Sequence, residues 1–529
     1  MIRAWLGVVV LVLAAPIAAL AQQPPDYDVL IRGGRVLDGT GMPWRLADVA
    51  IRGERIVAVG HVPPAATATR TVDARGRYVT PGFIDPHSHS IPGLTRAELA
   101  AAVPILHQGV TTVVINPDGG GPADLAPQLA AIREHTPGVN VVPTIGHNAV
   151  RSAVMGHANR APTADEMRGM EALVRQAMEL GAFGFTSGPF DVPGKYSMTA
   201  ELVALAKVAA EFPGAFHASH VRDESNYDIG VVAAVQELIQ VSREARLPGV
   251  VTHIKALGPS VWGKSRDVIE VINAARAEGV EIWADQYPYA ASSTGLQPAL
   301  VPGWAREGGQ EAMARRLQDP EQRALIRREM ADNLARRGGP NAIMILQYES
   351  DPSRQGKRLD EIARERLEDP LDTAIEMLID SGGAPIVSFN MNEQDVEAFM
   401  QQPWTMTCTD GGLSEFGRRA EHPRAYGAFP RKIRLYSMDR GVVPLERVIH
   451  SSTGLTATVL GIEDRGFLRP GAFADVVVFD PETITDVATY PEPDAYSVGM
   501  DFVFVNGRAA VVEGKVVAER SGRILWPTR

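Results

Sequence analysis

The sequence predicts an α/β protein in which a (β/α)8 barrel, or TIM barrel, is inserted into a small β-sandwich built from both chain ends. Two observations support this fold class. Strand-like and helix-like segments alternate through the middle of the chain, and short strand-like runs with glycine turns occur at both ends. A chain of 529 residues is long enough for a barrel with an insertion and a smaller module. We expect the N-terminal part of the sandwich at 28–73, the barrel at 74–455 and the C-terminal part of the sandwich at 466–520.

The composition is typical of a globular enzyme rich in turns, with 45% hydrophobic and 22% charged residues, 50 glycines and 38 prolines. The net charge of -11 argues against a nucleic-acid partner, because binding to phosphates requires a basic surface. The same charge means that an anionic small-molecule substrate needs arginine or lysine placed locally. An oligomer is possible, but its state is left open.

The N-terminus has the three parts of a cleavable secretory signal. A positive charge precedes the apolar run at 6–20, and small residues at its end suit a cleavage site. We assign 1–21 to a signal peptide and expect a periplasmic or secreted protein. The alternative, a membrane anchor, is disfavoured because the run is short and contains Pro16. No later stretch is long and apolar enough to span a bilayer, so no stable membrane insertion is expected after cleavage.

Within the barrel region, apolar runs have the length and composition of parallel strands. They lie at 78–84, 110–115, 139–145, 182–186, 215–220, 250–255, 281–286 and 405–409. One helix is well delimited, because Thr163 and Glu166 form a capping box and apolar residues recur at helical spacing up to Gly181. The polar span around 303–395 is expected to be an insertion that overhangs the active site and contains one further β–α unit.

Two histidines follow the strand at 78–84 and begin a predicted metal site. His87 and His89 are spaced i and i+2, so an extended backbone places both imidazoles on one face, where they can ligate a divalent ion. Metal-type residues follow four other strand-like runs: Asp118, His220, His253 and Asp410. In a barrel, all these strand ends meet at one mouth. Six such ligands suffice for two metal ions, or for one ion and a free base.

Each of these residues has a simpler explanation when it is taken alone. Histidines can be solvated or packed in a core, and Asp118 can stabilise the glycine turn at 119–121. The predicted site therefore depends on their joint occurrence at strand ends. The single cysteine, Cys408, excludes an internal disulfide. Its place inside the apolar run 405–409 favours a buried structural thiol over a metal ligand.

The chain resembles a known family over nearly its whole mature length. Residues 81–89, Pro-Gly-Phe-Ile-Asp-Pro-His-Ser-His, resemble the first-strand signature of the amidohydrolase superfamily. Later motifs resemble the D-aminoacylase (N-acyl-D-amino-acid deacylase) family within it, among them Ser219-His220-Val221-Arg222-Asp223-Glu224, Thr252-His253-Ile254-Lys255, Asp285-Gln286-Tyr287-Pro288-Tyr289, Thr409-Asp410-Gly411 and His422-Pro423-Arg424.

The resemblance implies a role for each ligand. His220 and His253 would hold a tightly bound metal ion, and His87 and His89 a second, weaker one. The implied cofactor is Zn²⁺, as one or two divalent ions. Asp410 would be the catalytic base on the last barrel strand.

Asp118 is a departure from the family pattern, because it stands where the D-aminoacylases have a metal-binding cysteine. A carboxylate can ligate zinc and bridge two ions, but it is a harder ligand than a thiolate. The substitution therefore bears on the identity and number of the metal ions.

The resemblance also points to residues around the substrate. The planar guanidinium of Arg424 suits the carboxylate of an N-acyl amino acid, and Lys255 faces the same mouth. Tyr287 and Ser293 occupy positions that the family uses around its substrate. For His147 two roles stay open, namely orienting the substrate carbonyl or packing.

We therefore expect a metal-dependent hydrolase that cleaves the amide bond of N-acyl-D-amino acids, or related N-acyl amino acids, to a carboxylate and a free amino acid. One alternative is an amidohydrolase that acts on a cyclic amide or a dipeptide, which a position of Arg424 outside the mouth would favour. A second is a non-catalytic exported metal-binding protein. The presence of Asp410 argues against it, because a structural metal site is closed and needs no free base.

Overall fold

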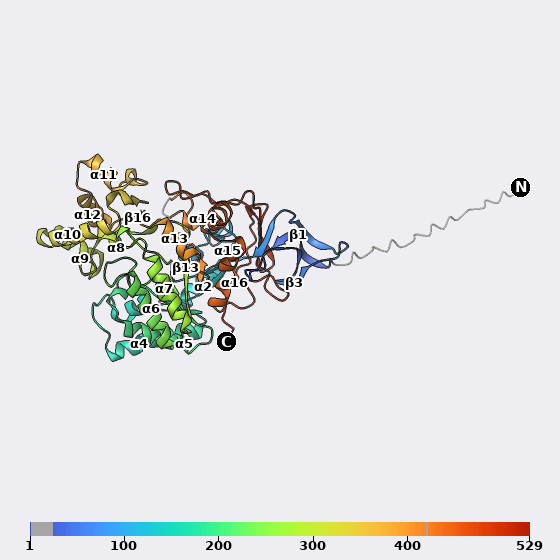
Figure 1. The fold of residues 1–529 in the computed structure, drawn as a ribbon, viewed down its shortest axis with the longest axis horizontal. Helices are drawn as coiled ribbons and strands as arrows, with labels where there is room; N and C mark the ends of the chain where they lie inside the picture. Colours follow the sequence, from blue (N-terminus) through green and yellow to red (C-terminus); the bar gives the residue numbers. More distant parts are fainter. Residues whose placement is uncertain (2–24, 419–421, 529) are drawn as a thin grey trace.

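The computed structural model describes residues 1, 25–418 and 422–528. Apart from residue 1, the predicted signal peptide at 1–21 lies outside this part of the chain and stays a prediction. No helix among the described residues is long and apolar enough to cross a membrane. Figure 1 shows the N-terminal strands at one end of the molecule and the helices of the insertion at the other.

The two ends of the chain meet in one nine-stranded sheet. Its strands are β1 (Tyr27–Val36), β2 (Arg45–Arg52), β3 (Arg55–Gly60), β4 (Ala68–Asp73), β5 (Tyr78–Pro81), β18 (Val476–Phe479), β19 (Met500–Val505), β20 (Arg508–Val512) and β21 (Lys515–Val516). The strand order is β21-β20-β19-β18-β5-β1-β2-β3, with β4 beside β1. The halves join where β5 pairs antiparallel with β18, and Val79 and Val476 are buried at this seam. Strands from both ends therefore share one hydrophobic core.

The chain passes from this sheet into the parallel strands at Gly82. The predicted single strand at 78–84 is wrong, because β5 belongs to the terminal sheet and β6 (Phe83–Asp85) pairs with β7 (Val110–Val114). A Cβ atom at position 82 would lie 2.2 Å from Oγ1 of Thr111, so only glycine fits at this crossing. The uniform apolar pattern cannot reveal the division, since both halves are buried.

Parallel strands fill the middle of the chain and alternate with helices, as predicted. One sheet contains β6, β7 and β8 (Asn140–Val142). The other runs in the order β9 (Ile145–Gly146), β10 (Gly184–Ser187), β11 (Phe216–Ser219), β12 (Gly249–Val251), β13 (Ile282–Gln286) and β17 (Thr405–Thr407). Backbone hydrogen bonds also join the segments after the first and last strands: His89 N–H donates to Gly411 O at 2.9 Å, and Asp410 N–H donates to His87 O at 3.0 Å.

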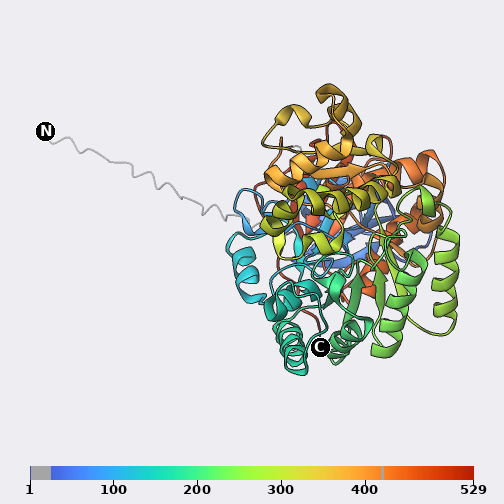
Figure 2. The same ribbon diagram turned by 90° about the vertical axis from the view of Figure 1, so that its left-hand side faces the viewer.

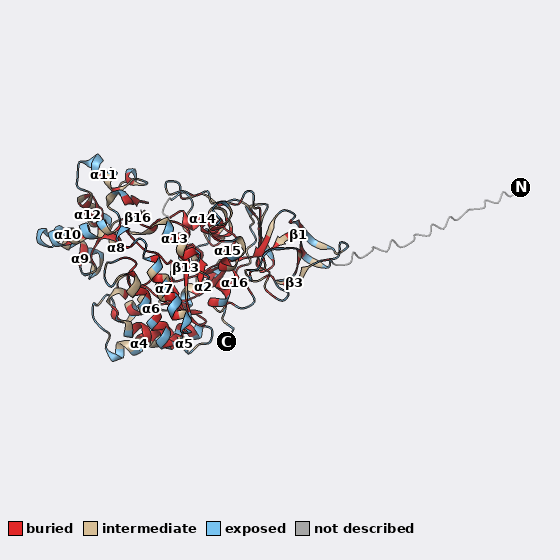
Figure 3. Cartoon of the chain, in the orientation of Figure 1, coloured by how far each residue is buried: buried red, intermediate tan, exposed pale blue. Residues whose placement is uncertain are grey.

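The helices between and after these strands lie around the outside of the parallel sheets (Figure 2). They include α1 (Val103–Leu106), α2 (Ala126–Glu134), α3 (His147–Met155), α4 (Ala164–Leu180), α5 (Thr199–Ala210), α6 (Val231–Ala245), α7 (Ser265–Ala277), α13 (Glu393–Met400), α14 (Arg424–Arg431), α15 (Leu445–Ser452) and α16 (Gly454–Val459). The predicted helix is confirmed as α4, with the capping box of Thr163 and Glu166 and with Gly181 at φ +110°. Exposed residues gather on the outer faces of such helices (Figure 3).

The chain between β13 and β17 forms a separate subdomain. It contains α8 (Leu296–Leu300), α9 (Gly309–Gln318), α10 (Pro320–Arg336), α11 (Leu359–Arg366) and α12 (Pro370–Ser381), with the antiparallel sheet of β14 (Ser292–Gly295), β16 (Pro385–Ser388) and β15 (Ile343–Ile345). This subdomain has its own hydrophobic core. The prediction of a further β–α unit of the barrel here is wrong, because β13 pairs directly with β17 and β15 and β16 pair elsewhere.

Candidate metal centre

The strand ends bring the predicted ligands together in two groups. In the first group, Nε2 of His87 and Nε2 of His89 each lie 3.2 Å from Oδ2 of Asp118. Oδ1 of Asp410 lies 3.5 Å from Nε2 of His87 and 3.2 Å from Nε2 of His89. The ligand atoms of all four residues lie within 4.8 Å of one another, a spacing that suits a single metal ion.

Asp118 links this group to a second one. Its Oδ1 lies 3.5 Å from Nε2 of His253 and 3.8 Å from Nδ1 of His220. The two histidine nitrogens are 3.1 Å apart. Asp118 therefore turns one oxygen toward each pair of histidines, as expected of a carboxylate that bridges two ions.

Three of these residues have an unusual backbone conformation. The φ angle is +55° at Asp118, +36° at His253 and +47° at Asp410. Non-glycine residues rarely adopt positive φ, although Asp and His tolerate it better than most. Such conformations persist where the surrounding structure holds them, and they concentrate at functional sites. Their occurrence at three strand ends indicates that the chain is constrained to direct these side chains into one mouth.

The charges of the cluster fit a divalent cation. Burial opposes the ionisation of Asp118, but the neighbouring His87 and His253 hold its pKa well below the ordinary range. Burial lowers the pKa of His89, but hydrogen bonds to Asp118 and Asp410 raise it to about 10. The carboxylates thus attract protons to the imidazoles, and a divalent ion would release these protons, because ligating imidazoles are neutral. The nitrogen and oxygen donors suit zinc or a related ion.

Asp410 is held as an ionised carboxylate. Its Oδ2 lies 2.7 Å from Nη1 of Arg424, while its Oδ1 faces His89. Although burial opposes ionisation, Arg424 and His253 hold the pKa of Asp410 far below its ordinary value. Cys408, two residues earlier, is a buried free thiol, which confirms the prediction for it.

A cavity of about 270 Å³ opens beside the two ligand groups. Four of the predicted substrate residues line it: Lys255, Tyr287, Ser293 and Arg424. The guanidinium of Arg424 lies 4.5 Å from the centre of the Tyr287 ring, a contact that orients it. The ammonium of Lys255 donates to Glu224 and lies 2.7 Å from Nδ1 of His253. Lys255 is thus anchored in the wall, and β14 of the insertion supplies a further part of it.

His147 does not line this cavity. It begins α3 and is fully buried; its Nε2 lies 2.8 Å from Oε1 of Glu201, and its Nδ1 lies 3.2 Å from Oδ1 of Asn148. Glu201 also accepts a hydrogen bond from Arg151 at 2.5 Å. Of the two roles left open for His147, orienting the substrate carbonyl or packing, these contacts support packing. The helix that starts directly after β9 directs the imidazole toward α5, where it packs.

Comparison with known proteins identifies the family. A model of the amidohydrolase family matches residues 70–518. The chain belongs to the amidohydrolase family. The match includes the ligand residues at all five strand ends, so the metal site and the family model cover the same part of the chain.

Relatives that match nearly the full length of this amidohydrolase include a D-aminoacylase and an N-acyl-D-glutamate deacylase. The chain is 34% identical over 525 residues to a D-aminoacylase of Alcaligenes xylosoxydans xylosoxydans. This match covers 95% of this chain and 98% of the relative. The chain is 36% identical over 520 residues to an N-acyl-D-glutamate deacylase of the same organism, covering 94% and 96%. Among solved structures, an N-acyl-D-glutamate deacylase from Bordetella bronchiseptica, complexed with zinc and a phosphonate inhibitor, matches with a TM-score of 0.80 at 34% identity, covering 94% and 99%. The resemblance predicted from the motifs is thereby confirmed.

Two carboxylates that support the ligands were not assigned from the sequence. Oε1 of Glu224 lies 3.1 Å from Nδ1 of His253, which leaves Nε2 of that ring facing Asp118. Asp285 accepts a hydrogen bond from the backbone N–H of His253 at 2.7 Å and lies 4.0 Å from Nδ1 of His87. Carboxylates beside ligating imidazoles help to orient the rings. Glu224 lies close enough to the His253 ring for this, whereas 4.0 Å between Asp285 and His87 is longer than a hydrogen bond. The sequence did offer a signal for both carboxylates, because Glu224 and Asp285 belong to motifs that carry the family resemblance.

Proposed function

We propose that this protein is a zinc-dependent hydrolase that cleaves the amide bond of N-acyl-D-amino acids to a carboxylate and a free D-amino acid. One observation carries the proposal: the ionised Asp410 lies between Arg424 and a two-part cluster of histidines, at the wall of a cavity. The D-aminoacylase and the N-acyl-D-glutamate deacylase that match nearly the full chain support the same substrate class.

Five residues would bind the metal, and Asp410 would transfer the proton. The metal would be held by His87, His89, Asp118, His220 and His253. When bound, such an ion supplies Lewis acidity toward the scissile carbonyl and the attacking water. Asp410 accepts the proton of that water and transfers it to the leaving nitrogen, so that the amino acid departs as a neutral amine.

Arg424 would place the carboxylate of the substrate. A guanidinium presents five N–H donors in one plane, so a single arginine can bond Asp410 and a substrate carboxylate together. The amide nitrogen next to that carboxylate would then lie near the base that delivers its proton. Tyr287, beneath the guanidinium, keeps its plane in position.

The alternatives are less well supported. A cyclic amide offers no carboxylate to Arg424, whose guanidinium lies inside the mouth beside Asp410. A purely structural metal site would be closed, whereas here a cavity adjoins the ligands and the base. The observations therefore favour hydrolysis of a linear amide next to a carboxylate.

A matched substrate panel tests this function. Purified protein is analysed for metal content and assayed on N-acetyl-D-leucine, N-acetyl-L-leucine, a D-configured dipeptide and a hydantoin. We expect one or two zinc ions per chain and the highest kcat/KM on the linear N-acetyl-D-amino acid. A higher kcat/KM on the hydantoin or the dipeptide would favour the alternative amidohydrolases, and a zinc-loaded protein without hydrolytic activity would favour the non-catalytic role.

We also infer the finer architecture and the location. The hydrogen bonds between the segments after β6 and β17 support closure of the parallel strands into a (β/α)8 barrel, with the terminal sheet as the β-sandwich.

The apolar run at 6–20 supports export to the periplasm or medium. Fractionation of producing cells tests the location, and recovery only in the cytoplasm would contradict it.

A further inference from the structure

His422 is a buried histidine that the mechanism above leaves without a role. It lies two residues before Arg424, the first residue of α14. Its Nδ1 accepts a hydrogen bond from the backbone N–H of Arg424 at 3.0 Å, and its Nε2 lies 3.2 Å from the carbonyl oxygen of Ala291. A carbonyl oxygen only accepts, so the ring proton is on Nε2. One neutral tautomer of His422 therefore makes both contacts.

The surroundings of the ring hold it in this state. Burial, together with the positive charge of Arg424, keeps the pKa of His422 well below its ordinary range. The rings of Tyr289 and Tyr490 meet the imidazole edge to face, each with its centroid 5.1 Å from that of His422. Aromatic pairs of this geometry are favourable. The imidazole thus has a fixed orientation as well as a fixed proton.

The contact with Arg424 caps the helix at its first residue. The first N–H groups of a helix find no acceptor within it, and the N-cap residue of α14 is Pro423, whose ring carries no acceptor. His422 supplies the acceptor that the N–H of Arg424 requires. The first turn also packs closely on the segment after β17, because a Cβ atom at Gly411 would lie 2.6 Å from Cα of Ala425. The start of α14 therefore rests against the strand end that carries the proposed base.

The contact with Ala291 joins α14 to another wall of the metal cavity. Ala291 lies between β13 and β14. Tyr287 directly follows β13, Ser293 lies within β14, and both line the cavity together with Arg424. Through its two nitrogens, His422 thus connects the backbone of the arginine with the segment that carries two other side chains of the cavity wall.

We propose that His422 is a positioning residue, which fixes Arg424 so that its guanidinium lies beside Asp410 and faces the substrate carboxylate. The end of the Arg424 side chain is held by Oδ2 of Asp410 at 2.7 Å and by the ring of Tyr287 at 4.5 Å. A long side chain has many rotamers, so its end is placed accurately only when its backbone is also fixed. The proposal rests on the proposed N-acyl-D-amino-acid hydrolase activity and adds a residue on which its carboxylate recognition depends.

Two conservative variants separate the two hydrogen bonds of the ring. In His422→Asn, the side-chain oxygen can take the place of Nδ1 and still accept from Arg424. In His422→Gln, the longer amide can take the place of Nε2 and still donate to Ala291, but the acceptor for Arg424 is lost. We expect His422→Asn to keep kcat/KM on N-acetyl-D-leucine within about threefold of the wild type. His422→Gln should lower it by about 10-fold or more, because a small displacement of a substrate-positioning group has an effect of this size.

A double-mutant cycle shows whether His422 acts through Arg424. In an Arg424→Lys background there is no guanidinium to position, so adding His422→Gln should lower kcat/KM by less than about threefold. The control Tyr289→Phe keeps the ring beside His422 and removes the hydroxyl that donates to the carbonyl of Pro423 at 3.4 Å. This variant breaks another hydrogen bond to the same turn and should keep the wild-type kcat/KM.

Thermal unfolding shows whether the variants are folded. If His422→Gln does not fold, His422→Phe takes its place, because it keeps a ring between the tyrosines and removes both hydrogen bonds. Crystal structures of the zinc-loaded wild type and of the folded variant provide a readout that does not depend on activity. We expect the Arg424 guanidinium to leave its position beside Asp410 in the variant.

The possible failures are distinguishable. Wild-type kcat/KM in His422→Gln, or an equal loss with and without Arg424, would overturn this inference and leave the proposed function standing. A larger loss in His422→Asn than in His422→Gln would also overturn it, because the effect would then come from the contact with Ala291. If the wild type does not hydrolyse N-acetyl-D-leucine, the proposed function fails. The crystal structures then decide the inference, and an Arg424 guanidinium that stays in place would overturn it.

Discussion

At the scale of the residue, Asp410 combines two contacts that a catalytic base needs. One oxygen lies beside the guanidinium of Arg424, and the other faces the imidazole of His89. The first contact keeps the carboxylate ionised, and the second places it where a reacting water would lie. The oxygen that faces His89 also lies within the first ligand group, so this position suits a metal ligand as well as a base.

The variant Asp410→Asn separates these roles. The amide keeps the shape of the side chain but is not basic, so we expect kcat to fall by at least about 100-fold. The metal content should stay near that of the wild type, because Asp118 and the four histidines remain. Metal analysis and kinetics on the same preparation provide the measurement. Loss of metal together with activity would show that Asp410 acts mainly as a ligand, and near-normal turnover would remove it from the mechanism.

At the scale of the element, α4 is defined by local sequence. The Thr163 side chain accepts a hydrogen bond from the backbone of Glu166, and the carboxylate of Glu166 accepts one from the backbone of Thr163 at 2.7 Å. Thr163→Ala removes one of these reciprocal bonds and should lower the free energy of unfolding by about 1 kcal/mol. Urea unfolding measures this loss. Gln176→Ala, an exposed change on the same helix, is the control and should have little effect; equal losses would contradict the capping role.

The strands of the insertion, unlike α4, are not defined by local sequence alone. Its runs at β15 and β16 have the composition of strands, yet they pair in a small antiparallel sheet with β14. A short apolar run does not encode its partner, because pairing depends on which strands the rest of the chain brings near. This subdomain supplies β14 to the cavity beside the candidate metal ligands, so its position bears on the shape of that cavity.

At the scale of the whole molecule, the candidate metal ligands lie at five strand ends and bring together parts of the chain that are far apart in sequence. They follow β6, β7, β11, β12 and β17. An ion bound only by the folded state stabilises it by mass action, by about 2.7 kcal/mol when its free concentration is 100 times its Kd. Removal of the metal should therefore lower the melting temperature.

Thermal unfolding after treatment with a zinc chelator measures this effect. We expect a lower Tm than in the untreated protein and recovery of the original Tm when zinc is added back. His253→Asn should reduce the difference between the two states, because it removes a ligand of the second group. Identical Tm values with chelator and with zinc would show that the ligand groups do not hold a metal that matters for stability.

The sequence alone was sufficient for the features that depend on local pattern or on short spacing. The alternation of strands and helices, the capped helix α4, the ligand residues after five strands and the buried thiol of Cys408 could all be predicted from it. These features follow from periodicity and from the rule that the carboxyl ends of parallel strands meet at one mouth.

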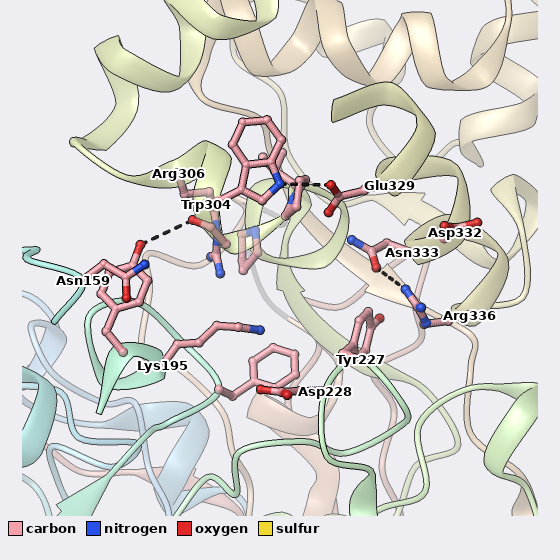
Figure 4. Close-up of a pocket in the computed structure, with 16 residues that line it drawn as sticks. Asn159, Lys195, Tyr227, Asp228, Trp304, Arg306, Glu329, Asp332, Asn333 and Arg336 are labelled. Atoms are coloured by element: carbon pink, nitrogen blue, oxygen red, sulfur yellow. Dashed lines mark hydrogen bonds between the residues drawn. The ribbon is translucent and has the colours of Figure 1, made fainter. Parts of the chain in front are cut away.

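Other features were decided only by the tertiary structure. The switch between sheets at Gly82, the inward packing of His147 and the two oxygens of Asp118 facing different histidine pairs depend on neighbours from distant segments. The pocket that Lys195 and Arg306 line (Figure 4) is of the same kind, because these residues belong to different units and meet only when the insertion folds over the loops. The physical reason is that local sequence determines the type of an element, whereas the direction of a side chain and its partners depend on packing between elements.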